Sequence, residues 1–184
     1  MRNNELKRCF IALDLPREAE NEIKGIQNKI KKQNLLIGKF TEPENLHLTL
    51  KFLGEIDEEI IDKAKKRLHD IKIQEFEASL GECGIFSQKF IKIVWIKLEG
   101  KGIWELQKKI DESLKDLFAP EERFMSHITL ARVKKVPDRK KLIEYIKNIK
   151  PKNLKFLVNE FFLKKSILQP EGPVYEDIER YLLK

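Results

Sequence analysis

The sequence predicts an α+β fold in which two mainly antiparallel sheets face each other across a central groove, with helices outside. The main observation is a pattern that occurs twice, at His47–Leu50 and at His127–Leu130. Each copy alternates polar and apolar residues, as a half-buried strand does, and each is followed by an apolar repeat of helical spacing. The copies begin at residues 47 and 127, so they lie 80 residues apart, which indicates a duplicated lobe rather than a short repeat. We therefore expect a bilobal molecule with pseudo-two-fold symmetry.

The first half of the chain has the pattern of strand, helix, short strand, strand and helix. Pro16 ends the first apolar run and suits the first turn of a helix, in which Ile23, Ile26 and Ile30 recur at helical spacing. Asp57 is a typical N-cap for the second helix. The expected strands cover residues 7–15, 35–40 and 46–54, and the expected helices cover residues 17–33 and 58–69.

The second half has the pattern of two strands, a helix, the second His-Thr strand, another helix and two closing strands. Gly100 and Gly102 open the first of these helices, and Asp138 starts the second, which Pro151 breaks. No linker or low-complexity segment divides the chain, so we expect one domain over residues 1–184. The expected strands cover residues 74–85, 90–98, 124–133, 154–168 and 174–183, and the expected helices cover residues 100–117 and 138–149.

The composition favours a globular protein with an anionic partner. Of the 184 residues 41% are hydrophobic and 36% are charged, and the formal net charge is +7. A positive charge favours nucleic acid or a phosphorylated small molecule as the partner. Taken alone, the charge is explained more simply by a solvated, lysine-rich surface.

The cysteines and the apolar runs predict the compartment. Cys9 and Cys83 form no CxxC pair and lie in apolar runs, so we expect small core residues rather than a cysteine-based zinc site. No apolar run approaches the ~20 residues that span a bilayer. The opening stretch Met1–Arg8 is polar and basic and lacks the apolar region of a signal peptide. We therefore expect a cytoplasmic protein with no membrane segment.

The repeated pattern places an imidazole beside a hydroxyl. Residues two apart in a strand point to the same face, so His47 projects with Thr49, and His127 projects with Thr129. Two histidines that face one substrate suit in-line displacement at phosphorus, because one takes a proton while the other gives one. The threonine hydroxyls can donate to the phosphate oxygens, which gain charge in the transition state. This chemistry needs no metal and no cofactor, and we expect neither.

Other catalytic motifs are missing, and one cation stands near the second copy. The chain has no HExxH, GxxxxGK[ST] or GxSxG sequence, which excludes the sites that those motifs build. Arg132 lies three residues after Thr129, where it would add a charge-assisted contact to phosphate. Simple alternation puts Arg132 on the face opposite to His127, so this role requires a bulge, a strand end or a reach around the sheet edge.

Four segments together resemble the RNA 2′,3′-cyclic phosphodiesterases, also called 2′-5′ RNA ligases, within the two-histidine phosphoesterase superfamily. Arg8–Pro16 is similar to the opening strand of this family, and Pro43–Gly54 is similar to its first motif throughout. His127–Arg132 is similar to the second motif. The closing segment of the family is matched by Ser166–Leu168 with Gly172–Tyr175. The ordered matches extend over almost the whole chain and are far more specific than either His-x-Thr pair alone.

The resemblance implies a bilobal fold and the opening of a 2′,3′-cyclic phosphate at an RNA 3′ end to a 2′-phosphomonoester. It implies that His47 donates a proton to the leaving 3′ oxygen and that His127 activates water as the base. Thr49 and Thr129 would bind the phosphate, and Arg132 would assist them. The resemblance implies no metal and no bound nucleotide, and we expect a monomer that acts on RNA without a membrane partner.

Two alternatives stay open at this point. The same side chains would join RNA ends, such as tRNA halves, through a 2′-5′ bond if a 5′ hydroxyl replaced water. A non-catalytic protein that binds RNA ends would also explain the basic charge. The chain departs from the family pattern at Phe40, near a common tryptophan position, and at Ser126, where proline is common. Both departures concern the shape of the groove rather than the groups that transfer protons.

Overall fold

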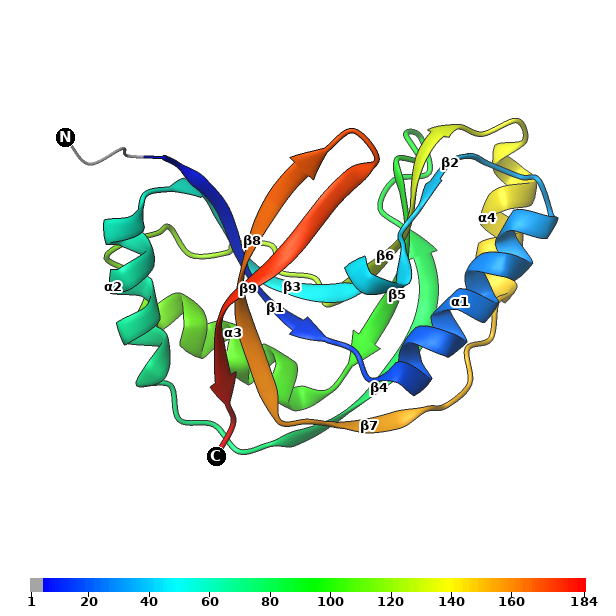
Figure 1. Cartoon of the computed structure of the whole chain (residues 1–184). Helices are drawn as coiled ribbons and strands as arrows, with labels where there is room; N and C mark the ends of the chain where they lie inside the picture. Colours follow the sequence, from blue (N-terminus) through cyan, green and yellow to red (C-terminus); the bar gives the residue numbers. More distant parts are fainter. Residues whose placement is uncertain (1–4) are drawn as a thin grey trace.

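The computed structural model describes residues 5–184, so the first four residues of the predicted domain and of the polar opening stretch lie outside the described residues. The described part contains four α-helices, one short 3-10 helix and nine strands (Figure 1). The strands are β1 (Lys7–Asp14), β2 (Ile37–Phe40), β3 (His47–Ile56), β4 (Phe76–Ile85), β5 (Ile93–Glu99), β6 (His127–Lys135), β7 (Lys155–Val158), β8 (Glu160–Gln169) and β9 (Gly172–Leu182). The helices are α1 (Arg17–Lys32), η1 (Pro43–Asn45), α2 (Glu58–His69), α3 (Lys101–Ser113) and α4 (Arg139–Asn148).

The strands form one curled antiparallel sheet rather than two separate sheets, which corrects that part of the prediction. The order is β7-β4-β5-β6-β3-β1-β8-β9, and β2 pairs with the β6 strand off this path. β3 and β6 join the two halves through a single register pair, Leu48 with Ile128. The two strands diverge on either side of this pair, so each half curls away from the other (Figure 1). The α+β class and the antiparallel pairing are confirmed.

The predicted strand over residues 154–168 is in fact two strands, separated at Asn159. β7 pairs with β4 in one half, whereas β8 pairs with β1 in the other half. The chain therefore crosses along the lower edge of the molecule and turns upward into β8 (Figure 1). Alternation of apolar residues continues through both strands because both are half-buried, so the pattern cannot reveal that the partner strand changes.

The helices cover the outer side of the sheet, two for each half. In Figure 1 α2 and α3 flank the half that contains β1, and α1 and α4 flank the half that contains β5. Asp57 caps α2 by accepting from the Ile60 amide at 2.9 Å, as predicted, and Asp138 caps α4 by accepting from the Lys141 amide at 3.1 Å. Helix α3 ends at Ser113, before the predicted end, because the chain then continues in turns. No helix within residues 5–184 is long and apolar enough to cross a membrane.

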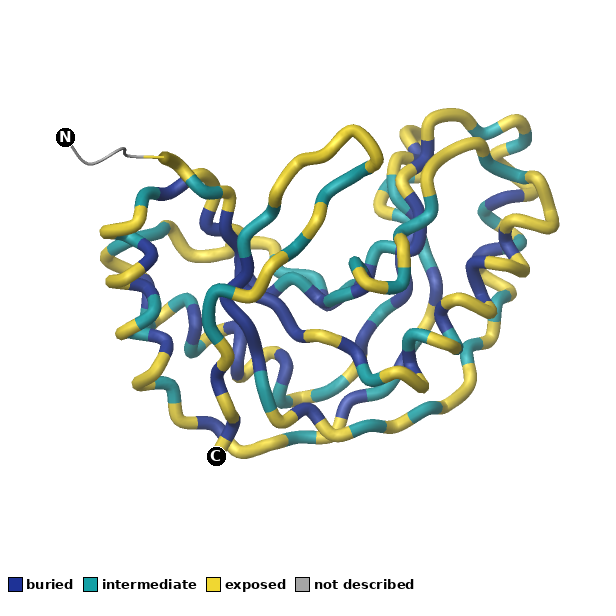
Figure 2. Tube along the Cα trace, in the orientation of Figure 1, coloured by how far each residue is buried: buried dark blue, intermediate teal, exposed yellow. Residues whose placement is uncertain are grey.

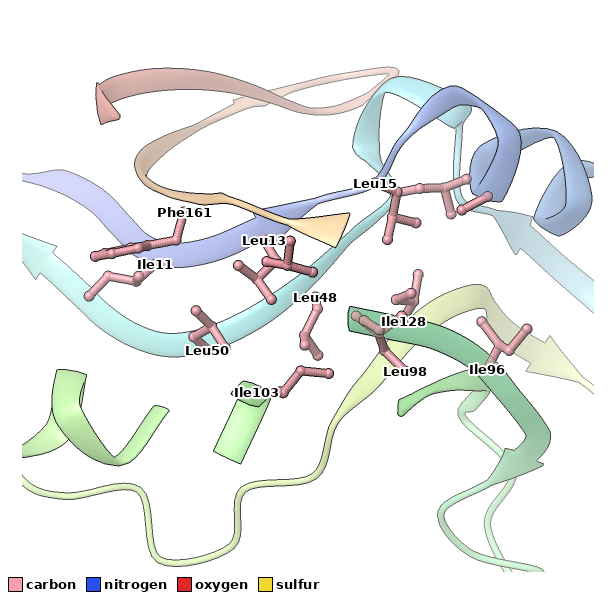
Figure 3. Close-up of a cluster of buried hydrophobic side chains, with 14 of the residues drawn as sticks. Ile11, Leu13, Leu15, Leu48, Leu50, Ile96, Leu98, Ile103, Ile128 and Phe161 are labelled. Atoms are coloured by element: carbon pink, nitrogen blue, oxygen red, sulfur yellow. The ribbon is translucent and has the colours of Figure 1, made fainter. Parts of the chain in front are cut away.

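The core lies between the sheet and its helices and includes the junction of the two halves. Figure 2 shows buried residues along the strands and on the inner faces of the helices. Leu48 and Ile128 are both 0% exposed, and Figure 3 places them among buried residues of both halves. Cys9 and Cys83 are buried in this core without forming a disulfide, as expected for small core residues.

Replacing Leu48 by Ala should lower the free energy of unfolding by about 2–5 kcal/mol, because it leaves a cavity at the only register pair between β3 and β6. Urea denaturation monitored by circular dichroism measures this change. Leu157→Ala is the matched control, since Leu157 is 55% exposed on β7 and its truncation should change stability by less than about 0.5 kcal/mol. Similar losses in both variants would contradict the proposed importance of the junction.

Candidate active site

The two His-Thr pairs lie side by side where the halves of the sheet meet. His47 and Thr49 flank Leu48 at the start of β3, and His127 and Thr129 flank Ile128 at the start of β6. Because the strands are antiparallel, the pairing of Leu48 with Ile128 puts each histidine on the side of the opposite threonine. All four polar side chains line one groove with a volume of about 890 Å³.

The backbone orients both imidazole rings in the same way. Nδ1 of His47 lies 2.8 Å from the Asn45 carbonyl oxygen, and Nδ1 of His127 lies 2.7 Å from the Met125 carbonyl oxygen. A carbonyl only accepts, so Nδ1 carries a proton in both rings, and Nε2 of the neutral ring is an acceptor. In His47 this Nε2 accepts from the Thr49 hydroxyl at 3.0 Å. Each histidine therefore presents the nitrogen that can exchange a proton with a ligand in the groove.

Each strand contains a bulge directly after its His-Thr pair. The bulge turns the residue three positions after the threonine toward the groove. The register skips Leu50 in β3 and Leu130 in β6, where two consecutive residues are buried. After the bulge Phe52 and Arg132 line the groove together with the histidines. The bulge is the departure from alternation that a contact between Arg132 and phosphate requires.

Aromatic rings enclose the two histidines unequally. The His47 ring lies 5.0 Å from the Phe10 ring and 5.1 Å from the Tyr175 ring, which meets it edge-on. His127 has one such neighbour, Phe86, at 4.8 Å. These apolar surroundings exclude water from one side of each imidazole and from His47 most of all.

Burial lowers the pKa of both histidines. Desolvation lowers the pKa of His47 to about 4, although its bond to the Asn45 carbonyl opposes the shift; the positive charges of Lys164 and Arg132 lower it further. Burial also lowers the pKa of His127, against the opposing effect of the Met125 carbonyl. Both imidazoles are consequently neutral at pH 7 while no anion is bound.

Buried polar side chains fix the strand that carries each pair. Gln27, on α1, donates to the carbonyls of Leu130 and Thr41 at 2.9 and 2.8 Å, and so ties the helix to the bulge of β6, where the Leu130 carbonyl also accepts from the Thr41 amide at 3.0 Å. Lys51, at the bulge of β3, is 3% exposed and pairs with Asp111 on α3. Removing one partner of such a buried pair leaves a costly unpaired charge, so the pair holds β3 against α3.

The groove also carries cations that are not neutralised by carboxylates. Arg8, Arg123 and Arg132 line it, and within residues 5–184 none of the three has a carboxylate oxygen within 4.0 Å. Many lysines elsewhere on the surface do form ion pairs with carboxylates, and these three arginines differ from them in having none. In the same part of the chain no group of three or more His, Cys, Asp or Glu side chains is placed to hold a metal ion.

The sequence predicted the five polar residues that meet here but not their enclosure. Phe10 and Tyr175 lie on β1 and β9, and Phe86 directly follows β4, so only the order of strands in the sheet brings these rings to the histidines. Their aromatic character is equally typical of core residues. Phe10 and Tyr175 also fall in the segments that resemble the family, but that resemblance did not indicate their contact with His47. The carbonyls that orient the imidazoles depend on backbone conformation, which side-chain patterns do not report.

Comparison with known proteins gives the family. The LigT-like phosphoesterase profile matches residues 13–95 and 97–175. The chain belongs to the LigT-like phosphoesterase family. It is 37% identical to the RNA 2′,3′-cyclic phosphodiesterase of Methanocaldococcus jannaschii, over 95% of this chain and 99% of that protein. It is 35% identical to the RNA 2′,3′-cyclic phosphodiesterase of Methanothermobacter thermautotrophicus, over 96% and 98% of the two chains.

Solved structures of the LigT-like family have the same fold. The apo form of Escherichia coli LigT superposes with a TM-score of 0.80 at 25% identity, over 98% of this chain and 99% of that one. The complex of E. coli LigT with 3′-AMP gives a TM-score of 0.78 at 25% identity, with the same coverage. The resemblance expected from the sequence is thus confirmed over nearly the full length of the LigT-like chain.

His47→Gln should make the protein less sensitive to acid. Since the folded pKa of about 4 lies below the ordinary 6.5, the unfolded chain binds a proton first as pH falls, and wild-type stability drops between pH 6.5 and 4. Relative to wild type, the variant should gain about 3 kcal/mol of unfolding free energy from pH 7 to pH 4. Urea denaturation at the two pH values measures the gain. His69→Gln, at a histidine whose side chain is 57% exposed, is the control. A parallel pH dependence of His47→Gln and wild type would contradict the buried neutral state.

Proposed function

We propose that this protein hydrolyses 2′,3′-cyclic phosphates at RNA 3′ ends to 2′-phosphomonoesters without a metal, acting as a single bilobal domain. The observation that carries the proposal is the pair of imidazoles on adjoining strands, each with Nδ1 bonded to a backbone carbonyl and Nε2 available in a shared groove. The relatives in M. jannaschii and M. thermautotrophicus support the choice of reaction and of RNA as substrate. tRNA halves as the particular RNA, a monomeric state and a cytoplasmic location are predictions from the sequence.

The proposed roles follow the sequence prediction. His127 accepts a proton from water through Nε2, and the water oxygen bonds to phosphorus. The bond between phosphorus and the 3′ oxygen breaks, and His47 gives its proton to that oxygen. Thr49, Thr129 and Arg132 donate hydrogen bonds to the phosphate oxygens, on which charge accumulates. The phosphate stays on the 2′ oxygen, and no redox partner enters.

The charge of the substrate prepares the acid. An imidazole with a pKa of about 4 is a poor proton donor at pH 7, because it is seldom protonated. A phosphodiester carries a negative charge, and an opposite charge close by favours the protonated imidazole. Protonation at Nε2 also frees the Thr49 hydroxyl proton, which now points to that nitrogen, for the phosphate. Substrate binding and activation of His47 are therefore coupled.

We further infer that the groove descends from an internal duplication. The two histidines are 80 residues apart, and the same offset relates buried residues of α1 to buried residues of α3. It relates Ile23 to Ile103 and Gln27 to Gln107. The bulge residues Leu50 and Leu130 keep the same offset. A two-fold relation through the junction would explain why two equivalent proton-transfer groups face one groove.

Wild-type protein in excess chelator should convert a nucleoside 2′,3′-cyclic phosphate to the 2′-monophosphate, observed by phosphorus NMR. His47→Ala and His127→Ala should each lower kcat by about 10²–10⁴-fold, the usual contribution of a positioned acid or base. The product identity reports which P–O bond breaks, and the chelator reports metal dependence.

His69→Ala is the matched control for these variants, because this third histidine is exposed at the end of α2 and remote from the groove. It should retain wild-type turnover. Formation of the 3′-monophosphate would reverse the assigned roles of His47 and His127. Full activity in either groove variant, or no turnover of any cyclic phosphate by wild type, would contradict the proposed reaction.

The pH profiles of kcat/KM and kcat should differ. The alkaline limb of kcat/KM should lie below pH 6.5, because the pKa values of both imidazoles in the empty groove lie below that value. The alkaline limb of kcat should lie at higher pH, since the bound phosphate raises both pKa values. Steady-state kinetics between pH 4 and 9 would test this, and superimposable profiles would argue against coupling between phosphate charge and imidazole.

A further inference from the structure

One row of side chains in the groove has no part in the proposed reaction. Arg8 on β1 pairs across the sheet with Ser166 on β8, and Ser166 pairs with Tyr175 on β9. Residues directly opposite each other in neighbouring strands project to the same face. All three line the groove, so a guanidinium, an aliphatic hydroxyl and a phenol stand together along one wall.

The position of this row relative to the histidines is set by the strands. Arg8 precedes Phe10 by two residues, which is one same-face step of about 7 Å along β1. The Phe10 ring itself lies 5.0 Å from the His47 ring, and the Tyr175 ring lies 4.9 Å from Phe10 and 5.1 Å from His47. Arg8 is thus one step beyond the aromatic wall of the catalytic pair, with Tyr175 reaching between them.

The electrostatics of the row suit an anion. Glu55 is the neighbour of Arg8 on β3, yet within residues 5–184 no carboxylate oxygen comes within 4.0 Å of that guanidinium. Burial raises the pKa of Tyr175, and the charges of Arg132 and Arg8 oppose the rise, which places the phenol in the field of both cations. Across the groove two more cations lie on neighbouring strands, because Lys39 on β2 is opposite Arg132 on β6 in the strand register.

We propose that Arg8, with Ser166 and Tyr175, binds the phosphodiester that precedes the terminal nucleotide of the RNA. The inference rests on the proposed function and deepens it: the preferred substrate is an oligonucleotide rather than a mononucleotide. A guanidinium with two hydroxyl groups that can donate matches the several acceptor oxygens of a phosphodiester. The terminal nucleotide would lie along Phe10, between the reacting phosphate and this second one.

The test compares two substrates that share the terminal nucleoside cyclic phosphate, a mononucleotide and a trinucleotide. Arg8→Gln should lower the ratio of the two kcat/KM values, trinucleotide over mononucleotide, by about tenfold, the effect of losing one charge-assisted contact. The slope of log affinity for the trinucleotide against log salt concentration should become less negative by about 0.7, as expected when one phosphate contact of a single strand is lost.

Two further variants separate the outcomes. Arg139→Gln removes an equal charge from the start of α4, away from the groove, and should leave the ratio unchanged. Arg123→Gln removes the cation at another part of the groove lining. If the ratio fell in Arg123→Gln and not in Arg8→Gln, the RNA would follow another path and the proposal would be wrong. Equal losses on both substrates in Arg8→Gln would also overturn it.

A binding measurement keeps this inference distinct from the proposed reaction. Isothermal titration with the 2′-phosphorylated trinucleotide and the 2′-mononucleotide requires no turnover. Arg8→Gln should weaken the first about tenfold more than the second. If wild type turned over neither cyclic phosphate but this difference persisted, the second phosphate site would stand and the proposed reaction would fail. No difference in binding would reject the second phosphate site whatever the turnover.

Discussion

The groove depends on the pairing of Leu48 with Ile128, the one register pair through which β3 and β6 join the halves of the sheet. Both side chains are fully buried, so the junction is held by the core rather than by the polar groups that it positions. A sheet that continued its pairing past this point would bring the strands flat against each other. Because the strands diverge at once, the polar residues on either side of the pair open onto a groove instead of a ladder.

Bulges and buried polar groups convert this junction into a site. The skipped residues Leu50 and Leu130 rotate the following part of each strand, which brings Arg132 to the face of the histidines. At the bulge of β6 the Leu130 carbonyl accepts from the Thr41 amide, and Gln27 on α1 donates to the same carbonyl and so ties the helix to the bulge. In the other half the buried pair of Lys51 and Asp111 anchors the equivalent strand to α3. The two halves thus share the geometry of the bulged strand, but different side chains hold that strand in place.

Periodicity and caps were sufficient for most helices and strands and for the two His-Thr pairs, because these features are encoded locally. The single sheet was not predictable, since the choice between one sheet and two depends on one pair of apolar residues. The break at Asn159 was missed because β7 and β8 share the same alternation while pairing in different halves. Tyr175 and Phe10 meet His47 only through the order of strands, and Arg132 reaches the groove only through a bulge that alternation argues against.

The environment of the histidines and the charge of the groove depend on each other. Aromatic enclosure and neighbouring cations keep His47 neutral in the empty groove, which by itself would disable an acid. The same cations attract an anion, and the anion reverses their effect on the imidazole by adding negative charge beside it. A neutral ligand would bring no such reversal. In the reaction we propose, selection for a phosphate ester therefore needs no separate recognition element at His47, because only an anionic ligand would place a proton on the imidazole for the leaving oxygen.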